Sequence, residues 1–172
     1  PINRKEKIML NYVEHGFGPV YDKHSKILIL GSFPSVKSRQ QQFYYGHPQN
    51  RFWKVLAALV DTEVPQTVEE KKEWLYAHHI AVYDVIEACE IEGSSDSSIK
   101  NVKPADIGKI VEESEIERIY TNGKTAGKLY RKYQAKTCTL PMAELPSTSP
   151  ANAMFSLERL IDEWRKKIKM TS

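Results

Sequence analysis

The stretch "KILILG" (Lys26–Gly31) is a short, unbroken apolar run that ends in glycine. Such a run is typical of a parallel β-strand covered on both faces, because half-exposed antiparallel strands alternate apolar and polar residues. A polar loop, "SFPSVKSRQQQFYYGHPQ", follows it, and apolar residues then recur at helical spacing from Phe52 to Val60. The stretch therefore predicts a strand, a polar loop at its carboxyl end and a helix after the loop.

The same alternation continues along the chain. Further strands are expected at "IAVYDVIE" (80–87), "IERIYTNG" (116–123) and "KTCTLP" (136–141). Further helices are expected at 65–79, 104–114, 124–133 and 157–168, with Asn50 and Asn152 as candidate caps of the first and last helices. Strands that alternate with helices form parallel sheets through right-handed crossovers. The expected fold is α/β: a three-layer α/β/α sandwich with a central, mainly parallel four-stranded sheet.

Length and composition narrow the class of protein. The 172 residues suffice for one buried core and are few for two, so a single domain over 1–172 is expected. No run approaches the roughly 20 apolar residues of a membrane span, and charges interrupt the opening segment. A cytoplasmic, nucleoid-associated protein with no membrane partner is expected. Cys89 and Cys138 lack metal-ligand spacing, which favours buried free thiols, no metal and no cofactor.

Four polar segments are expected at one edge of the sheet. In parallel sheets, ligands bind at the carboxyl ends of the strands, near the point where the strand order reverses. The segments there are "GSFPS" (31–35), "YDVIE" (83–87), "TNGK" (121–124) and "LPSTSPAN" (145–152). The first and last are small-residue turns rich in hydroxyl and backbone N–H groups, which suit phosphate binding. A net charge of +3 is compatible with a polyanionic partner but identifies none.

These motifs together resemble the uracil-DNA glycosylase superfamily over nearly the whole chain. The resemblance rests on "LILGSFPS", "YYGHPQNRFWKVL", "YDVIEACEIEGSSDSSI", "IYTNGKTAGKLY" and "LPSTSPAN", in that order, before a terminal helix. "HPQNRFWKV" resembles the mismatch-specific uracil/thymine enzymes, whereas "GSFPS" with "YDVIEACEIEGSSDSSI" is more similar to the hypoxanthine (deoxyinosine) branch. The resemblance implies a monofunctional, monomeric enzyme that flips a deaminated nucleotide out of DNA and hydrolyses its N-glycosidic bond. Hypoxanthine is the favoured base, with a uracil/thymine mismatch as the alternative.

Two positions depart from the uracil-excising branches. Phe33 stands where those branches carry an aspartate or asparagine that positions water, and Leu145 replaces a histidine or asparagine that stabilises the leaving base. A phenyl ring cannot orient water. Either another polar group does so, or the chain is a non-catalytic nucleic-acid-binding protein of the same fold. A serine hydrolase using Ser32 or Ser35 is disfavoured, because no Gly-x-Ser-x-Gly elbow is present.

The resemblance points to Asn50 as the catalytic residue, with its amide oxygen holding a water against C1′ of the sugar. His47 is a second catalytic candidate, which would stabilise charge on the departing base or contact a phosphate. From the residues alone, a helix cap is the favoured interpretation of Asn50, because asparagine is a preferred cap residue, and the two roles are compatible. Arg51 is expected to pair with a surface carboxylate.

Five residues are expected to form the base pocket. The resemblance implies that Tyr45 stacks on the flipped base and that Asp84 accepts N1–H of hypoxanthine or N3–H of uracil. Ser32, Phe33 and Asn122 are expected to line the same pocket. The alternatives are that Tyr45 anchors its loop and that Asp84 is a buried carboxylate bonded to a loop.

Phosphate contacts are expected from side chains in three of the strand-end segments. The candidates are Ser35, Lys124, Ser147, Thr148 and Ser149. DNA that contains a deaminated base is thus the expected partner.

Overall fold

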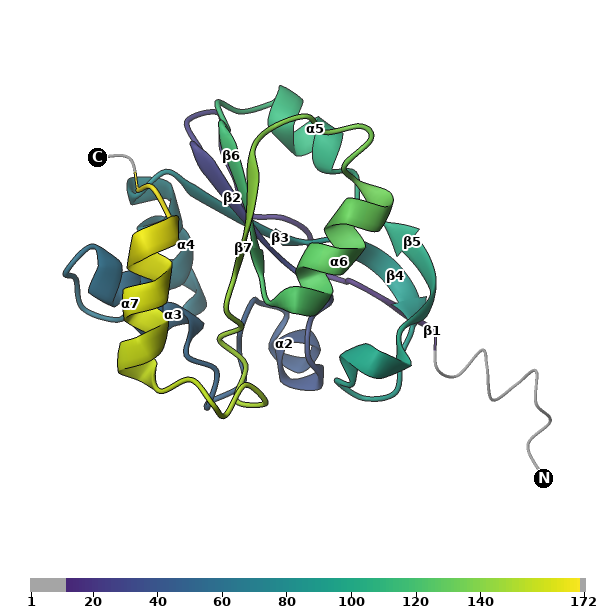
Figure 1. Ribbon diagram of the computed structural model, residues 1–172, viewed down its shortest axis with the longest axis horizontal. Coiled ribbons are helices and arrows are strands. Elements are labelled where there is room, and N and C mark those ends of the chain that lie inside the picture. Colours follow the sequence, from purple (N-terminus) through teal and green to yellow (C-terminus); the bar gives the residue numbers. More distant parts are fainter. Residues whose placement is uncertain (1–11, 171–172) are drawn as a thin grey trace.

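A four-stranded parallel sheet forms the centre of the protein (Figure 1). The computed structural model describes residues 12–170. The sheet has the order β3-β2-β6-β7, and its strands are β2 (Ile27–Gly31), β3 (Ile80–Asp84), β6 (Arg118–Asn122) and β7 (Met142–Leu145). The first strand of the sheet is therefore central. The strand order reverses between β2 and β6, which places a ligand crevice at their carboxyl ends.

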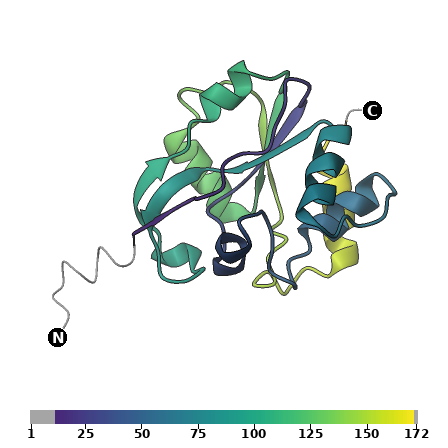
Figure 2. The same cartoon turned by 180° about the vertical axis from the view of Figure 1, so that it is seen from behind.

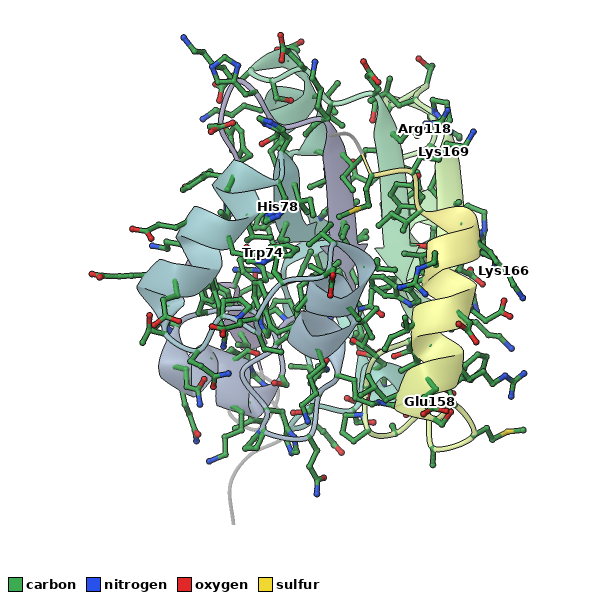
Figure 3. The ribbon with its side chains drawn as sticks, turned by 90° about the vertical axis from the view of Figure 1, so that its left-hand side faces the viewer. Trp74, His78, Arg118, Glu158, Lys166 and Lys169 are labelled. Atoms are coloured by element: carbon green, nitrogen blue, oxygen red, sulfur yellow. The ribbon has the colours of Figure 1, made fainter. Side chains whose placement is uncertain are left out.

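Helices cover both faces of this sheet. One face carries α3 (Phe52–Leu59), α4 (Val68–Ala77) and α7 (Leu157–Lys167), and Figure 3 looks onto it. The other face carries α5 (Ile107–Glu112) and α6 (Lys124–Tyr133) (Figure 1). The expected three-layer α/β/α fold with a parallel four-stranded sheet is confirmed.

A second, antiparallel sheet lies on the side of the molecule away from α7 (Figure 2). Its order is β1-β4-β5, with β1 (Tyr12–Glu14), β4 (Ile86–Glu90), β5 (Lys100–Pro104) and the short helix η1 (Asp96–Ser98) between β4 and β5. The prediction of a single strand over 80–87 was wrong. The chain leaves the parallel sheet at Val85, whose N–H donates to the carbonyl of Gly31 at 2.8 Å. β3 is buried throughout and Ile86 follows it after one apolar residue, Val85, so no turn residue marks the break in the sequence.

The fourth strand also differs from its prediction at 136–141. The N–H groups of Thr137 and Cys138 donate to the carbonyl of Gln134 at 3.1 and 2.9 Å, which makes this segment a continuation of the turns after α6. The strand forms instead at β7, directly after the segment. Thr and Cys tolerate extended backbone, but here the local turn bonds prevail over that preference.

The start of one helix and the presence of another also differ from the predictions. Ser156 caps α7 through its hydroxyl, which accepts from the N–H of Arg159 at 3.1 Å. Asn152 does not cap α7, since its amide instead donates to the carbonyl of Ser147 at 3.0 Å. A short helix, α2 (Val36–Gln41), occupies part of the segment expected to be loop.

The main core lies on both faces of the parallel sheet, against α3, α4 and α7 on one face and against Ile107 and Ile110 of α5 and Tyr130 of α6 on the other. Every residue of β2 and β3 is buried, and Leu160 and Trp164 of α7 complete the contact. Each fully buried Leu or Ile contributes roughly 1.5–3 kcal/mol, so this face fixes the positions of the strand ends. Cys89 and Cys138 are buried free thiols, as expected. Within residues 12–170, no helix has the length and apolar character needed to cross a membrane.

Candidate active site

A pocket of about 150 Å³ opens at the carboxyl ends of β2 and β6. It collects most of the residues that the sequence proposed: Ser32, Phe33, Ser35, Tyr45, Asn50, Asp84, Asn122, Ser147, Thr148 and Ser149. Topology explains the convergence, because the loops after parallel strands emerge at the same edge and the strand order reverses there.

A hydrogen-bond network joins three segments at the pocket wall. The hydroxyl of Thr148 donates to Oδ1 of Asn50 at 2.9 Å and accepts from Nδ2 of Asn122, also at 2.9 Å. The N–H of Thr148 donates to Oδ1 of Asn122 at 3.0 Å. Thr148 is fully buried, so its polar atoms bond to these protein groups and not to water. The start of α3, the end of β6 and the loop after β7 are thereby held in one arrangement.

The orientation of the Asn50 amide follows from its partners. Its Oδ1 also accepts from the N–H of Phe52 at 3.0 Å, and a backbone N–H can only donate. The N-cap position of α3 is Arg51, not Asn50 as expected, but Asn50 still satisfies one backbone N–H at the helix start, and both lone pairs of its oxygen are occupied. Within residues 12–170 its Nδ2 has no hydrogen-bond partner, so the spare capacity is that of a donor. The expectation that the amide oxygen holds a water is thus not supported by this geometry.

Asp84, the last residue of β3, is buried at the back of the pocket. Its Oδ2 lies 2.7 Å from Nε2 of His15, a residue directly after β1 that the sequence reading missed. Gly31 lies opposite Asp84 in the register between β2 and β3. A Cβ atom on Gly31 would lie 2.5 Å from Oδ1 of Asp84 and 3.0 Å from the hydroxyl of Tyr45. Only glycine lets these two polar groups approach the strand end.

Tyr45 stands against the first turn of α3. Its ring stacks on Phe52, with centroids 3.8 Å apart and planes inclined by 22°. Its φ of 52° lies in the left-handed region, which costs a bulky residue roughly 1–2 kcal/mol. Within the described part of the chain, its buried hydroxyl has no hydrogen-bond partner. Burial and then the charge of Asp84 raise the pKa of the Tyr45 hydroxyl, which keeps it protonated and able to donate.

Asp96 is a second carboxylate in the pocket lining, and the sequence reading did not single it out. The hydroxyl of Ser32 donates to its Oδ1 at 2.9 Å. Its loop is attached to α2 by the N–H of Val36, which donates to the hydroxyl of Ser94 at 2.9 Å. Asp96 is exposed as a residue, but desolvation of its carboxylate in the pocket raises its pKa against the lowering effect of the Ser32 hydrogen bond, and the charge of Asp84 raises it further. The residue lay within a quoted motif, but only the unpredicted turn between β4 and β5 brings it here.

Arg51 holds the loop that follows β7. Its guanidinium donates to the carbonyls of Ser149 at 2.8 Å, Asn152 at 3.1 Å, Thr148 at 3.4 Å and Phe155. The expected pairing with a surface carboxylate was wrong. A guanidinium group has five N–H donors in one rigid plane. Several carbonyls of this loop can accept from those donors at once, whereas a single exposed carboxylate cannot.

Two proposed residues lie outside the pocket lining. His47 is half-buried on the preceding loop, and its Nδ1 accepts from the N–H of Gln49 at 3.1 Å. Lys124 is exposed at the first turn of α6. Thr148 does line the pocket, but it cannot contact a phosphate as expected, because it is fully buried within the network described above.

The two departures from the uracil-excising pattern have packing roles. Phe33 is 8% exposed and packs with Ile86 and Cys89, so it forms an apolar wall of the pocket. The guanidinium carbon of Arg39 lies 5.7 Å from the centre of its ring. Leu145 belongs to the main core at the end of β7.

The comparison with known families agrees with this geometry. The model of the family "Uracil DNA glycosylase superfamily" matches residues 19–169. The chain belongs to the uracil DNA glycosylase superfamily. Among curated relatives, the hypoxanthine DNA glycosylase of Methanosarcina acetivorans is 36% identical over 159 residues, which cover 88% of this chain and 96% of the relative. The hypoxanthine DNA glycosylase of Methanosarcina barkeri is 32% identical over 117 residues, 67% of this chain and 74% of the relative.

A solved structure gives the same result for this superfamily member. The solution NMR structure of a protein from Methanosarcina acetivorans, provisionally named a uracil DNA glycosylase, matches with a TM-score of 0.76 and 34% identity. The match covers 88% of this chain and 94% of that chain. The expected family is thus confirmed, and with it the enzyme class, a DNA glycosylase that acts on DNA. His15 precedes the residues that the family model matches.

Proposed function

We propose that this glycosylase removes hypoxanthine from DNA and leaves an abasic site. One observation carries the choice of base: the pocket sets one carboxylate acceptor, Asp84, beside a group able to donate, the amide of Asn50. Hypoxanthine presents the complementary edge, with N1–H as donor and O6 as acceptor. Adenine, its undamaged parent, presents an acceptor at N1 and a donor at N6. The names of the two curated relatives support the same base.

The flipped base is proposed to stack on the ring of Tyr45. Phe52 fixes that ring from behind at 3.8 Å, so the stacking platform needs no rearrangement when the base enters. The apolar wall at Phe33 excludes water from the pocket and strengthens the polar contacts to the base edge. Prior organisation of both features lowers the cost of binding an extruded nucleotide.

The hydrolytic step needs a group that acts on water, and Phe33 cannot supply it. We assign this role to Asp96, whose carboxylate is held by Ser32, the immediate neighbour of Phe33. Asp96 accepts a proton from water as the water oxygen bonds to C1′. The bond from C1′ to N9 breaks, and its electron pair leaves with the base, which takes a proton from solvent. The amide N–H of Asn50 stabilises the charge that develops on the base.

The DNA backbone is proposed to cross the rim of the pocket. Ser35, Ser147 and Ser149 line this rim with hydroxyl and backbone N–H groups, while His47 and Lys124 lie outside it. We propose the monomer as the working unit. We place the enzyme where DNA is accessible, in the cytoplasm and at the nucleoid.

An excision assay tests the proposal. Labelled duplexes with a single hypoxanthine, uracil, xanthine or mismatched thymine are incubated with the protein, and abasic sites are cleaved with alkali. Strand cleavage at hypoxanthine that is lost in Asn50→Ala is expected. Preferential cleavage at uracil would reassign the substrate, because N3–H of uracil also suits Asp84. Binding without cleavage at any base would identify a non-catalytic DNA-binding protein instead.

A further inference from the structure

A buried histidine stands behind the carboxylate that faces the pocket. His15 and Asp84 are each 3% exposed, and their side chains meet at 2.7 Å. The proposed reaction does not use His15, and His15 lies before the segment that the family model matches. Its place in the structure depends on the antiparallel sheet, since β1 pairs with β4 and the N–H of His15 donates to the carbonyl of Glu87 at 2.8 Å.

The surroundings of His15 determine where its proton lies. Its Nδ1 is buried and has no hydrogen-bond partner within residues 12–170. The rings of Phe17, Tyr83 and Tyr44 surround it, with centroids 4.4, 4.9 and 5.6 Å away. A proton on Nδ1 would be a buried N–H without an acceptor, which native structures avoid. The proton therefore resides on Nε2, which donates to Asp84.

This hydrogen bond fixes the two oxygens of Asp84 in different roles. Oδ2 is committed to His15, while Oδ1 lies against the strand end at Gly31, beside the hydroxyl of Tyr45. Because a donor occupies one oxygen of the carboxylate, the other oxygen is left to accept from the pocket. Tyr44, Tyr45, Tyr83 and the second pocket carboxylate, Asp96, are the other titratable groups around Asp84, and the three tyrosines are neutral because burial raises each pKa.

We propose that His15 is a positioning and specificity residue: by holding Asp84 as an acceptor, it makes the pocket select bases with a ring N–H beside a carbonyl, and reject adenine. The inference rests on the proposed function, since it assumes that Asp84 contacts the base. Without His15, no donor holds Oδ2 of Asp84, so its other oxygen is no longer aimed as an acceptor at the ring N–H that distinguishes hypoxanthine from adenine. Removal of His15 should therefore reduce selectivity and not only the rate of excision.

The first test compares His15→Phe with His15→Gln. Phe fills the same aromatic surroundings without a donor, whereas Gln can place an N–H near the position of Nε2. Binding of free hypoxanthine and free adenine is measured by NMR titration, on protein complexed with a duplex that carries a tetrahydrofuran abasic analogue. The affinity ratio of hypoxanthine to adenine is expected to fall about tenfold or more in His15→Phe, the effect of losing one oriented hydrogen bond. His15→Gln should restore most of the ratio.

A second variant keeps the test decisive if His15→Phe does not fold. In Asp84→Asn, Nε2–H of His15 still needs an acceptor, so the amide oxygen should face His15 and the NH₂ group should face the pocket. Adenine should then bind to Asp84→Asn more tightly than hypoxanthine does. A separate ¹⁵N spectrum of the wild-type protein should show the imidazole of His15 as a neutral ring protonated on Nε2. The proposal is overturned if folded His15→Phe keeps the wild-type ratio, or if Asp84→Asn does not invert it.

The two proposals can fail separately. If the wild-type protein excises no base, the proposed function fails, yet the preference for free bases and the imidazole spectrum still test His15. If hypoxanthine is excised and the affinity ratio is insensitive to His15, the function stands and the role of His15 falls.

Discussion

The hydroxyl of Thr148 donates to the amide oxygen of Asn50, a residue 98 positions earlier in the sequence. Because this bond occupies the amide oxygen, the NH₂ group is the part of the Asn50 amide that remains free. Thr148→Val removes the hydroxyl with little change in shape. It leaves Oδ1 of Asn50 with the N–H of Phe52 as its one remaining donor, and it leaves Nδ2 of Asn122 without its acceptor. We expect a loss of about 1–3 kcal/mol in unfolding free energy, measured by denaturant titration, and a large fall in single-turnover excision.

Thr148→Ser is the matched control, because it retains the hydroxyl. It should keep the excision rate to within a few fold. Equal losses of rate in the Val and Ser variants would show that packing of the methyl group matters, and not the hydrogen-bond network.

Arg51 should act at a distance from the base. Arg51→Lys keeps the charge but cannot bond several carbonyls at once, so the loop after β7 should lose its fixed position. We expect destabilisation of about 2 kcal/mol or more and a reduced excision rate, with faster hydrogen exchange in residues 146–156. Arg165→Lys is the control, since Arg165 donates to one exposed carbonyl, that of Ala58 at 3.2 Å. Unchanged exchange in the loop of Arg51→Lys would contradict the assignment.

Gly31 should tolerate no side chain. In Gly31→Ala, the new Cβ would lie 2.5 Å from Oδ1 of Asp84, and the buried strand β2 has no room to shift. We expect loss of binding of free hypoxanthine together with a lowered melting temperature. Gly108→Ala is the control: its Cβ would meet its nearest neighbour at an ordinary 3.6 Å, and alanine in α5 should stabilise by roughly 0.5–1 kcal/mol. Normal binding in Gly31→Ala would show that Asp84 does not contact the base.

Asp96 should set the acidic limb of the pH profile. Desolvation of its carboxylate in the pocket raises its pKa above the usual value of 3.8, and the proposed base form exists only above that raised pKa. The single-turnover rate should therefore rise with pH through an inflection above 3.8. Asp96→Asn should remove this inflection and lower the plateau by a factor of about 10² or more, the usual scale of general-base catalysis. Glu92→Gln, on the same loop, should keep the wild-type profile. A profile unchanged in Asp96→Asn would exclude the assigned role.

Features that depend on neighbouring residues in the sequence were predictable, whereas features that depend on residues far apart in the sequence were not. The strand at Lys26–Gly31 and the helix after Asn50 follow from local apolar spacing, and both form as expected. Most of the pocket lining was also predictable, since parallel topology alone collects the strand-end loops. The roles of individual atoms were not predictable. The acceptor capacity of Asn50 is consumed by Thr148, a partner that no local pattern identifies.

The residues that were missed share one physical cause. His15 and Asp96 enter the site through the antiparallel sheet, whose strand β4 continues an apolar run without any turn signal. Arg51 was misjudged because a charged residue near the surface is usually solvated or paired with another charge. Here its partners are backbone carbonyls of a loop about a hundred positions away, which sequence spacing cannot reveal.

The strand order also determines at which stage of synthesis the pocket can form. β2, the first strand of the parallel sheet, is central, whereas β7, the last, is at its edge. A nascent chain can form the β2–β3 half early, but the wall between Asn50 and Asn122 stays open until Thr148 has left the ribosome. Closing so long a segment is slow, because its loop entropy must be overcome before the contacts form. Catalytic competence should therefore appear only at the last stage of folding, after the hydrophobic core is largely in place.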